Sequence, residues 1–370
     1  MTLPAPHRRS IVKVGSSLLV SPEGEVRRAW LATLVADIAT RHAAGEQLVI
    51  VSSGAIALGA RKLGLAKGGR ASLEDAQAAA ATGQIALSQC WADLLDGHGI
   101  TAAQMLVTLD DLEDRRRYLN AAATLDRLIG LGVIPVINEN DSVATEEIRF
   151  GDNDRLAARI GQAAGAERVI LLSDVDGLFT ADPTRNPDAK RIEVVKRIDQ
   201  RIAGMAEEGT SSGMGSGGMG SKIEAARIAA SAGADLIIVS GKHDHPLDRL
   251  DGGGCGTVFM AKGNARARKA WLAGRLTVRG RVTVDAGAVK ALLGGASLLP
   301  AGARSVEGKF ARGDVIDISG PDGVAFARGL AEYDAEEAAL VCGKRSEELA
   351  DLLGHAPRAA MVHRDHMVLL

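Results

Sequence analysis

Apolar segments that end in small polar residues recur along this chain, and Ala- and Leu-rich stretches of helical pattern lie between them. A short apolar strand, a polar turn and a helix are the repeating unit of a parallel β-sheet covered by helices. Ligands of such sheets bind outside the carboxyl ends of the strands, so we expect the polar residues there to share one site. The predicted strands are residues 10–14, 48–51, 133–137, 169–172 and 236–239, and the predicted helices include 30–38, 74–95 and 118–131.

Length and composition fit a large α/β domain with a second, smaller one. The chain has 370 residues, more than one domain usually needs, and 46% of them are hydrophobic, which is enough for a large core. Aromatic residues make up only 3% against 44 glycines, which favours aliphatic strands, Ala-rich helices and tight loops. The net charge of −2 gives no general bias towards nucleic acids or membranes.

Targeting signals and cysteine spacing predict a cytoplasmic protein. No apolar segment follows the basic N-terminus, and no uncharged apolar run reaches the roughly 18 residues that a spanning helix needs. The 3 cysteines are widely spaced and show neither a metal-binding pattern nor an even-numbered disulfide framework. We therefore expect reduced thiols and no membrane span.

Two clusters of acidic and amide residues lie close together in the sequence. They are residues 137–141 (Ile-Asn-Glu-Asn-Asp) and 151–154 (Gly-Asp-Asn-Asp). The short segment between them could fold as a hairpin, which would place both clusters in one pocket. Asp and Asn offer the donors and acceptors that bind an ammonium, a carboxylate or a metal ion. Our hypothesis is that a small amino acid binds here and receives a phosphoryl group.

Candidate anion sites follow the first two predicted strands. Lys13 lies within an apolar strand, where burial of a lysine is costly, and Gly15-Ser16-Ser17 after it is typical of an anion-binding turn. An edge strand with an exposed lysine is the alternative. Ser53-Gly54 follows the second strand and precedes a helix, whose free N–H groups suit a carboxylate or a phosphate.

A glycine-rich stretch at 213–222 ends in Lys222, just before a helix predicted at 223–232. A phosphate-binding loop explains this arrangement better than a flexible linker does. The stretch contains GxGxxG, but the polar residues 206–212 before it cannot form the strand that a dinucleotide site requires. The Walker A ending GK[ST] is absent. Backbone N–H groups and one lysine still suit the β- and γ-phosphates of a nucleotide.

The order of these motifs resembles the amino acid kinase family, and most closely its members that phosphorylate glutamate. One position departs from the family pattern, because Gly220 stands where a hydroxyl residue is usual. The resemblance implies a mostly parallel sheet sandwiched by helices. It runs in order through most of residues 8–260 and is carried by residues 12–16, 53–56, 138–141, 151–154 and 217–222.

The resemblance also implies roles for individual residues. Catalysis is assigned to Lys13, Lys222 and Asp154, with both lysines beside the transferring phosphoryl group and Asp154 organising them. The acceptor amino acid is assigned to Ser53, Asp141 and Asn153, where Asp141 suits the ammonium and the other two suit the carboxylates. ATP is assigned to Lys13, Ser173, Asp174, Ser216, Gly217, Gly218, Met219, Gly220, Ser221 and Lys222. The alternative for 174–183 is an ordinary surface turn.

The implied reaction is ATP-dependent phosphorylation of the γ-carboxylate of L-glutamate to L-glutamyl 5-phosphate, the first step of proline biosynthesis. The acceptor carboxylate is ionised at neutral pH, so no general base is needed. Mg²⁺ should bridge the phosphates, with no protein ligand assigned to it. Feedback inhibition by proline and a homo-oligomer, dimer or tetramer, are further expectations of the resemblance.

The pattern changes after residue 262. We expect an amino acid kinase domain at 1–262, a basic linker at 263–275 and a small, mostly β barrel at 276–370 that resembles a PUA domain. PUA domains bind RNA in other proteins, so an RNA-binding or regulatory protein is the rival hypothesis. Residues 276–370 hold 11 Lys and Arg against 13 Asp and Glu, which is a poor match for a phosphate backbone.

A third hypothesis keeps the kinase reaction and changes the acceptor. Acetylglutamate, carbamate, aspartate or a nucleoside monophosphate would then replace glutamate. The Ser-Gly-Ala-Ile segment at 53–56, the Asn-Glu-Asn-Asp segment at 138–141 and the attached barrel favour glutamate.

Overall fold

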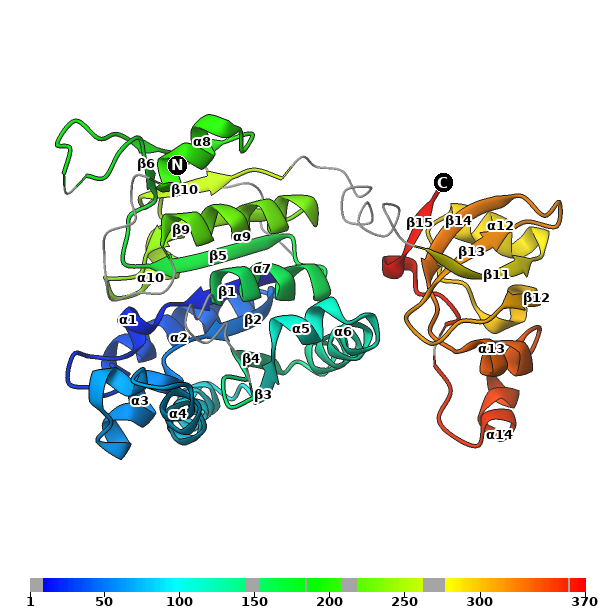
Figure 1. The fold of residues 1–370 in the computed structure, drawn as a ribbon, viewed down its shortest axis with the longest axis horizontal. Helices are drawn as coiled ribbons and strands as arrows, with labels where there is room; N and C mark the ends of the chain where they lie inside the picture. Colours follow the sequence, from blue (N-terminus) through cyan, green and yellow to red (C-terminus); the bar gives the residue numbers. More distant parts are fainter. Residues whose placement is uncertain (1–8, 144–152, 184, 208–217, 262–276, 359) are drawn as a thin grey trace. The chain divides into compact units, whose positions relative to one another are not determined.

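The computed structural model describes residues 9–143, 153–183, 185–207, 218–261, 277–358 and 360–370. The chain divides into two units, Met1–Lys262 and Gly263–Leu370, each with its own hydrophobic core (Figure 1).

The first unit is built on an eight-stranded sheet with the order β3-β4-β2-β1-β5-β9-β10-β8 in the described residues. Neighbours from β3 to β9 run parallel, whereas β10 is antiparallel to β9, so the predicted parallel sheet is confirmed. The strands are β1 Arg9–Val14, β2 Gln47–Ser52, β3 Ala102–Val107, β4 Ile134–Glu139, β5 Arg168–Ser173, β8 Val194–Val195, β9 Asp235–Ser240 and β10 Gly256–Phe259. A separate two-stranded sheet consists of β6 Leu178–Phe179 and β7 Arg191–Ile192.

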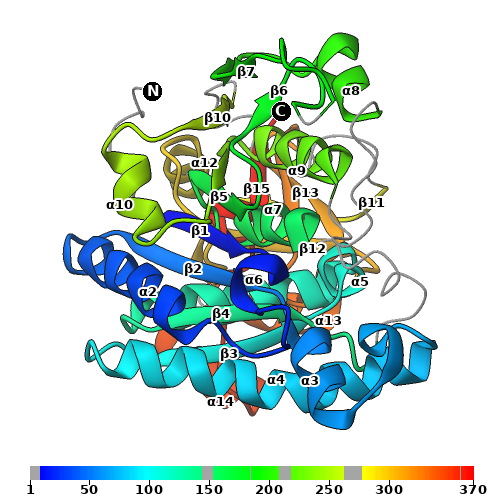
Figure 2. The ribbon, with the colours of Figure 1, turned by 90° about the vertical axis from the view of Figure 1, so that its left-hand side faces the viewer.

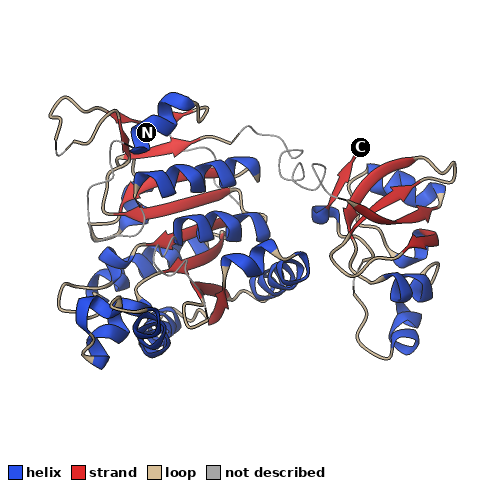
Figure 3. Ribbon diagram, viewed as in Figure 1, coloured by secondary structure: helices blue, strands red, loops and turns tan. Residues whose placement is uncertain are grey.

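Helices cover both faces of this sheet, as Figures 2 and 3 show. One face carries α5, α6, α7 and α9, and the other carries α2, α4 and α10. Their bounds are α1 Ser16–Leu19, α2 Arg28–Ala43, α3 Ala55–Leu63, η1 Ala66–Gly69, α4 Leu73–Asp96, α5 Leu109–Glu113, α6 Arg115–Gly130, α7 Asn153–Ala163, α8 Gln200–Glu207, α9 Met219–Ser231 and α10 Pro246–Asp251.

Alternation along β1 decides which side chains reach which face. Val12 and Val14 pack in the core beneath α2, and Ile11 lies on the opposite face, close to Gly161 of α7. Lys13 shares the face of Ile11. The lysine therefore points at the layer formed by α7 and α9, and it is only 8% exposed. The alternative of an edge strand with an exposed lysine is wrong, because β1 lies in the interior of the sheet.

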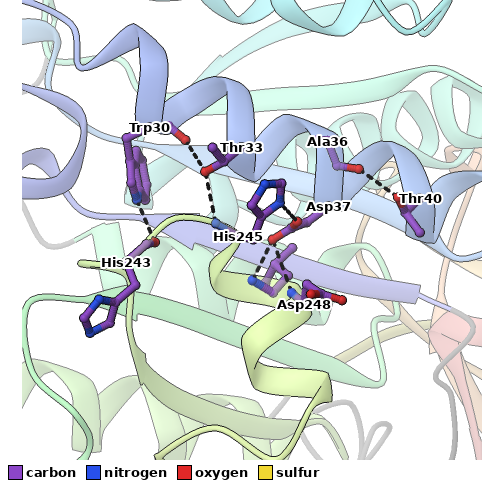
Figure 4. A network of polar contacts seen from close by, with 9 residues as sticks. Trp30, Thr33, Ala36, Asp37, Thr40, His243, His245 and Asp248 are labelled. Carbon is purple, nitrogen blue, oxygen red and sulfur yellow. Dashed lines mark hydrogen bonds and ion pairs between the residues drawn. The ribbon is translucent and has the colours of Figure 1, made fainter.

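A buried carboxylate ties the loop after β9 to helix α2 (Figure 4). Asp37 accepts hydrogen bonds from the ring of His245 at 2.7 Å and from two backbone N–H groups in the first turn of α10. His245 has a φ of 53°, a left-handed conformation that costs energy for a residue other than glycine. The indole of Trp30 also donates to the carbonyl of His243. These contacts hold the loop in place at the carboxyl end of the sheet.

In its described residues, the second unit has a five-stranded sheet with the order β12-β11-β13-β14-β15. β11 and β13 pair in parallel and the other neighbours are antiparallel. The mostly β character predicted for this region is confirmed, although helices make up a good part of it. The elements are β11 Val278–Val284, α12 Ala286–Leu293, η3 Pro300–Gly302, β12 Ala303–Gly308, β13 Val315–Ser319, β14 Ala325–Leu330, α13 Ala335–Val341, η4 Ser346–Glu348, α14 Leu349–Leu353, η5 Arg364–His366 and β15 Met367–Leu369.

Candidate active site

Two lysines from distant parts of the sequence share one carboxylate. Lys13 comes from β1, Asp154 from the first turn of α7 and Lys222 from the first turn of α9. The Nζ atom of Lys13 lies 2.5 Å from Oδ1 of Asp154, and the Nζ atom of Lys222 lies 2.9 Å from Oδ2. Their exposed fractions are 8%, 1% and 5%, so all three side chains are buried. The structure thus brings the three predicted catalytic residues together.

Among the described residues, this group holds two ammonium groups and one carboxylate. Burial opposes the charge of Asp154, but the ammonium groups of Lys13 and Lys222 hold the pKa of this carboxyl below its usual range. Two ammonium groups then share one carboxylate in a buried place, where a low dielectric strengthens their attraction for an incoming negative charge. The N-terminal ends of α7 and α9 add partial positive charge. The cluster is therefore suited to bind an anion such as a phosphate.

The amide of Asn153 connects this cluster to the ends of β2 and β4. Its Nδ2 donates to Oγ of Ser53 at 2.7 Å, to Oδ1 of Asn138 at 3.3 Å and to the carbonyl of Ser52 at 3.3 Å. Asn138 in turn donates from Nδ2 to Oε1 of Gln84 at 2.7 Å. Asn153 directly precedes Asp154 in α7, so the amide network and the charged cluster share one helix end.

Asp141 lies just beyond β4 and is 9% exposed. Burial raises the pKa of Asp141 to about 6, and the nearby charge of Arg70 opposes part of that shift. The residue lines a cavity of about 560 Å³ between α4, β3 and the segment after β4, and Gln84 lines the same cavity. An incoming ammonium group would favour the ionised form of this carboxyl.

Ser173 and Asp174 lie at the end of β5, the neighbour of β1. The hydroxyl of Ser173 donates to the Asp174 carboxylate at 3.2 Å. The backbone N–H of Gly15, in the turn after β1, donates to the carbonyl of Leu172 at 3.4 Å. Because parallel strands end at one edge of the sheet, these polar residues share that edge with the turn at Gly15.

The start of α9 differs from the prediction. Gly218 is the N-cap and the helix begins at Met219 rather than at residue 223. The Gly-Ser pair before Lys222 therefore forms part of the first helical turn, which presents backbone N–H groups beside the lysine. Two predictions lie outside the described residues. One is the assignment of Ser216 and Gly217 to ATP, and the other is the hairpin within 144–152 together with Gly151-Asp152.

Comparisons with known proteins identify the family to which the chain belongs. The sequence profile of the Amino acid kinase family matches residues 8–240, and that of the PUA domain matches residues 280–353. The chain belongs to the amino acid kinase family. It is similar to a protein named glutamate 5-kinase from Sphingopyxis alaskensis, with 66% identity over 367 residues and 99% of each chain covered. A protein of the same name from Zymomonas mobilis subsp. mobilis is 61% identical over 362 residues, which cover 98% of this chain and 91% of the relative.

Solved structures were found at lower similarity. An isopentenyl phosphate kinase is 19% identical with a TM-score of 0.47, and it matches 68% of this chain and 100% of its own. A carbamate kinase from Giardia lamblia bound to AMP-PNP is 16% identical with a TM-score of 0.48, and it matches 68% of this chain and 98% of its own. The family resemblance that the motifs indicated is confirmed by the profile match and the curated relatives.

Sequence reasoning missed several residues of this amino acid kinase that support the site. Gln84 and Trp91 both come from α4, and Trp91 donates from Nε1 to Oγ of Ser52 at 2.9 Å. Gln84 and Trp91 each contact a residue that is far away in the sequence, so no local motif reveals either contact. Asn138 belongs to a motif that the sequence does reveal, but its position at the centre of the amide network becomes visible only in the fold.

The described part of the chain shows neither a metal-binding cluster nor a membrane-spanning helix. No group of three or more His, Cys, Asp or Glu side chains there could hold a metal ion. No described helix is both long and apolar enough to cross a bilayer.

Proposed function

We propose that this chain transfers the γ-phosphoryl group of ATP to the γ-carboxylate of L-glutamate and forms L-glutamyl 5-phosphate, the first step of proline biosynthesis. The observation that carries the proposal is the shared carboxylate of Asp154, with Lys13 and Lys222 on its two oxygens. The choice of acceptor is supported by the curated relatives named glutamate 5-kinase, at 66% and 61% identity.

The reaction needs positive charge and positioning more than covalent help. A γ-carboxylate oxygen of glutamate attacks the γ-phosphorus of ATP, the bond from that phosphorus to the bridging oxygen breaks, and ADP leaves with the electron pair. Lys13 and Lys222 lie on either side of the transferring group and offset the charge on its oxygens. Asp154 holds both ammonium groups at fixed positions, which avoids reorganisation during the reaction. The acceptor is already ionised, so no base removes a proton.

The substrates are assigned to the two halves of the site. Glutamate binds to Ser53, Asp141 and Asn153, with its ammonium group on the carboxylate of Asp141. ATP binds along the sheet edge at Ser173 and Asp174, and at the start of α9 that ends in Lys222. The amide network of Asn153 lies between the two halves.

Mg²⁺ is expected to accompany the nucleotide. Both oxygens of Asp154 are occupied by lysines, and the described residues offer no carboxylate cluster that would bind the ion on its own. These residues therefore do not form a dedicated metal site. The ion would be held mainly by phosphate oxygens and water, and it would neutralise phosphate charge there.

Several finer expectations belong to the same proposal. One is the domain organisation, with a kinase domain at 1–262, a linker at 263–275 and a PUA-like domain at 276–370. The division of the structure into two units and the two profile matches support it. Inhibition by proline and a dimeric or tetrameric assembly remain predictions from the family, and a cytoplasmic location remains a prediction from targeting signals and cysteine spacing.

The test is acyl-phosphate formation from L-glutamate with ATP and Mg²⁺, trapped as the hydroxamate. We expect activity in the wild type and a loss of about 10²- to 10³-fold in Lys13→Ala and in Lys222→Ala, as for other electrostatic stabilisers. Lys62→Ala is the matched control, because Lys62 is an exposed lysine of α3.

The possible outcomes separate the hypotheses. Activity that needs Lys13 and Lys222 but not Lys62 supports both the reaction and its mechanism. A wild type that binds ATP but leaves glutamate unchanged contradicts the proposed acceptor. A panel of acetylglutamate, carbamate, aspartate and nucleoside monophosphates would then identify the true one.

A further inference from the structure

The amide oxygen of Asn153 is the starting point. The residue is 7% exposed, and its Oδ1 atom has no hydrogen-bond partner among the residues that the structure describes. A buried acceptor without a donor is costly, and such groups occur where a ligand supplies the missing partner. The oxygen belongs to the residue next to Asp154, at the junction of the two halves of the site.

Backbone groups fix which way the two central amides point. The carbonyl of Ser52 can only accept, so the atom of Asn153 that faces it must be the NH₂ nitrogen. The backbone N–H of Glu139 can only donate, so the atom of Asn138 that it contacts at 2.9 Å must be Oδ1. Asn138 therefore accepts from Asn153 through Oδ1, and its own NH₂ group points towards α4.

Gln84 of α4 completes this chain of hydrogen bonds. Its Oε1 accepts from Nδ2 of Asn138 at 2.7 Å, the shortest contact that Asn138 makes in the network. Without this acceptor the NH₂ group of Asn138 would lose its partner, and the amide would be free to rotate. Rotation would place a second NH₂ group against that of Asn153 and disturb the orientation of Asn153.

We propose that Gln84 is a positioning residue for the acceptor substrate. Through Asn138 it holds the Asn153 amide with the oxygen facing the substrate, where this oxygen accepts a hydrogen bond from the α-ammonium group together with the carboxylate of Asp141. This differs from the sequence prediction that Asn153 binds a carboxylate, since the NH₂ group of Asn153 is already occupied by protein acceptors. The inference rests on the proposed function, because it takes an amino acid as the acceptor.

The test compares two ligands that differ only in the ammonium group. Dissociation constants for L-glutamate and for glutarate, which lacks the amino group, are measured by calorimetry on the full chain. Gln84→Met removes the acceptor while keeping an unbranched side chain. Gln84→Glu keeps an acceptor for Asn138. Gln89→Met is the matched control, since Gln89 lines the same cavity from the same helix and its side chain donates to Asp93 within α4.

We expect the preference for glutamate over glutarate to fall about 10- to 100-fold in Gln84→Met, the value of one hydrogen bond to a charged group. Glutarate binding should change little. Gln84→Glu and Gln89→Met should keep the wild-type preference. The inference is overturned if Gln84→Met keeps the preference, or if it weakens both ligands equally, as a general loss of structure would.

Failure of this inference can be told apart from failure of the proposed function. A wild type that binds neither ligand contradicts the function itself. A wild type that prefers glutamate, with the same preference in Gln84→Met, contradicts only the role of Gln84. Thermal unfolding of each variant shows whether it is folded, and Gln84→Ala repeats the test if the methionine variant is not.

Discussion

At the scale of single residues, the carboxyl of Asp141 sets a pH dependence. Its folded-state pKa of about 6 results from burial, with Arg70 opposing, and only the ionised form can pair with the ammonium of glutamate. Protonation as the pH falls through about 6 should therefore lower kcat/KM for glutamate, by about tenfold for each further pH unit. In the complex the ammonium stabilises the carboxylate, so kcat should fall only at a lower pH.

The measurement is a pair of pH profiles, for kcat/KM and for kcat.

The carboxyl of Asp141 also affects the stability of the protein, in a direction that follows from its pKa. The pKa of Asp141 is raised in the folded state, so the folded protein binds the proton more tightly than the unfolded chain does. Asp141 therefore lowers the free energy of unfolding above about pH 6. This cost becomes smaller as the pH falls towards the pKa of Asp141 in the unfolded chain. Asp141→Asn should remove both effects. A kcat/KM profile that is flat from about pH 5 to 7 would show that Asp141 does not carry the ammonium contact.

Residues differ in how far the sequence alone reveals their role. Lys13 can be singled out because a lysine within an apolar strand requires a buried partner, and the family motifs name Asp154 as that partner. Gln84 cannot be found in this way. It lies within an Ala-rich helix, it fits the helical pattern as an ordinary polar residue, and its contact with Asn138 spans 54 positions.

At the scale of elements, two glycines determine how α3 meets α4. A Cβ at Gly83 would lie 1.9 Å from the carbonyl oxygen of Ala55, and one at Gly59 would lie 1.8 Å from that of Ala79. The helices can approach this closely only because both positions lack a side chain. Ala55 is the first residue of α3, so this crossing also fixes the backbone that follows Ser53.

We therefore expect Gly83→Ala to force the helices apart, to cost about 1–3 kcal/mol of unfolding free energy as overpacking does, and to weaken glutamate binding. The control is Gly130→Ala in the last turn of α6, where a Cβ meets nothing within 4 Å. That change should leave stability unchanged or raise it by up to about 1 kcal/mol. The measurements are urea unfolding and glutamate titration of both variants. If the two variants have the same unfolding free energy and the same affinity for glutamate, the crossing of α3 and α4 has no special role.

Elements were predictable where burial is complete. The five strands in the middle of the sheet are almost fully buried and mostly apolar, so their pattern is plain in the sequence. β3 at the sheet edge is partly exposed and contains Gln104, and β10 is only four residues long, so neither has such a pattern. The early start of α9 escaped prediction because glycine and serine are weak helix formers, whereas the packing of α9 against α7 overrides that preference.

At the scale of the whole molecule, the structure divides into two units at Lys262 and Gly263. Each unit has a core of its own. That of the first includes Leu31, Ile50 and Trp91, and that of the second includes Ile316 and Tyr333. The buried residues that form each core all come from one unit. The purpose of the second unit could not be read from its sequence, because its net charge favours no class of ligand.

Separate cores predict separate unfolding. We expect calorimetry of the full chain to show two transitions, and we expect a fragment of residues 1–262 to reproduce one of them and to retain glutamate phosphorylation. A chain ending at residue 314 lacks β13, β14 and β15, so it should lose the second transition and keep the first. If the 1–262 fragment fails to unfold cooperatively, the first core is not sufficient by itself. If it unfolds as expected but has lost its activity, the second unit contributes to catalysis by a route that stability alone does not reveal.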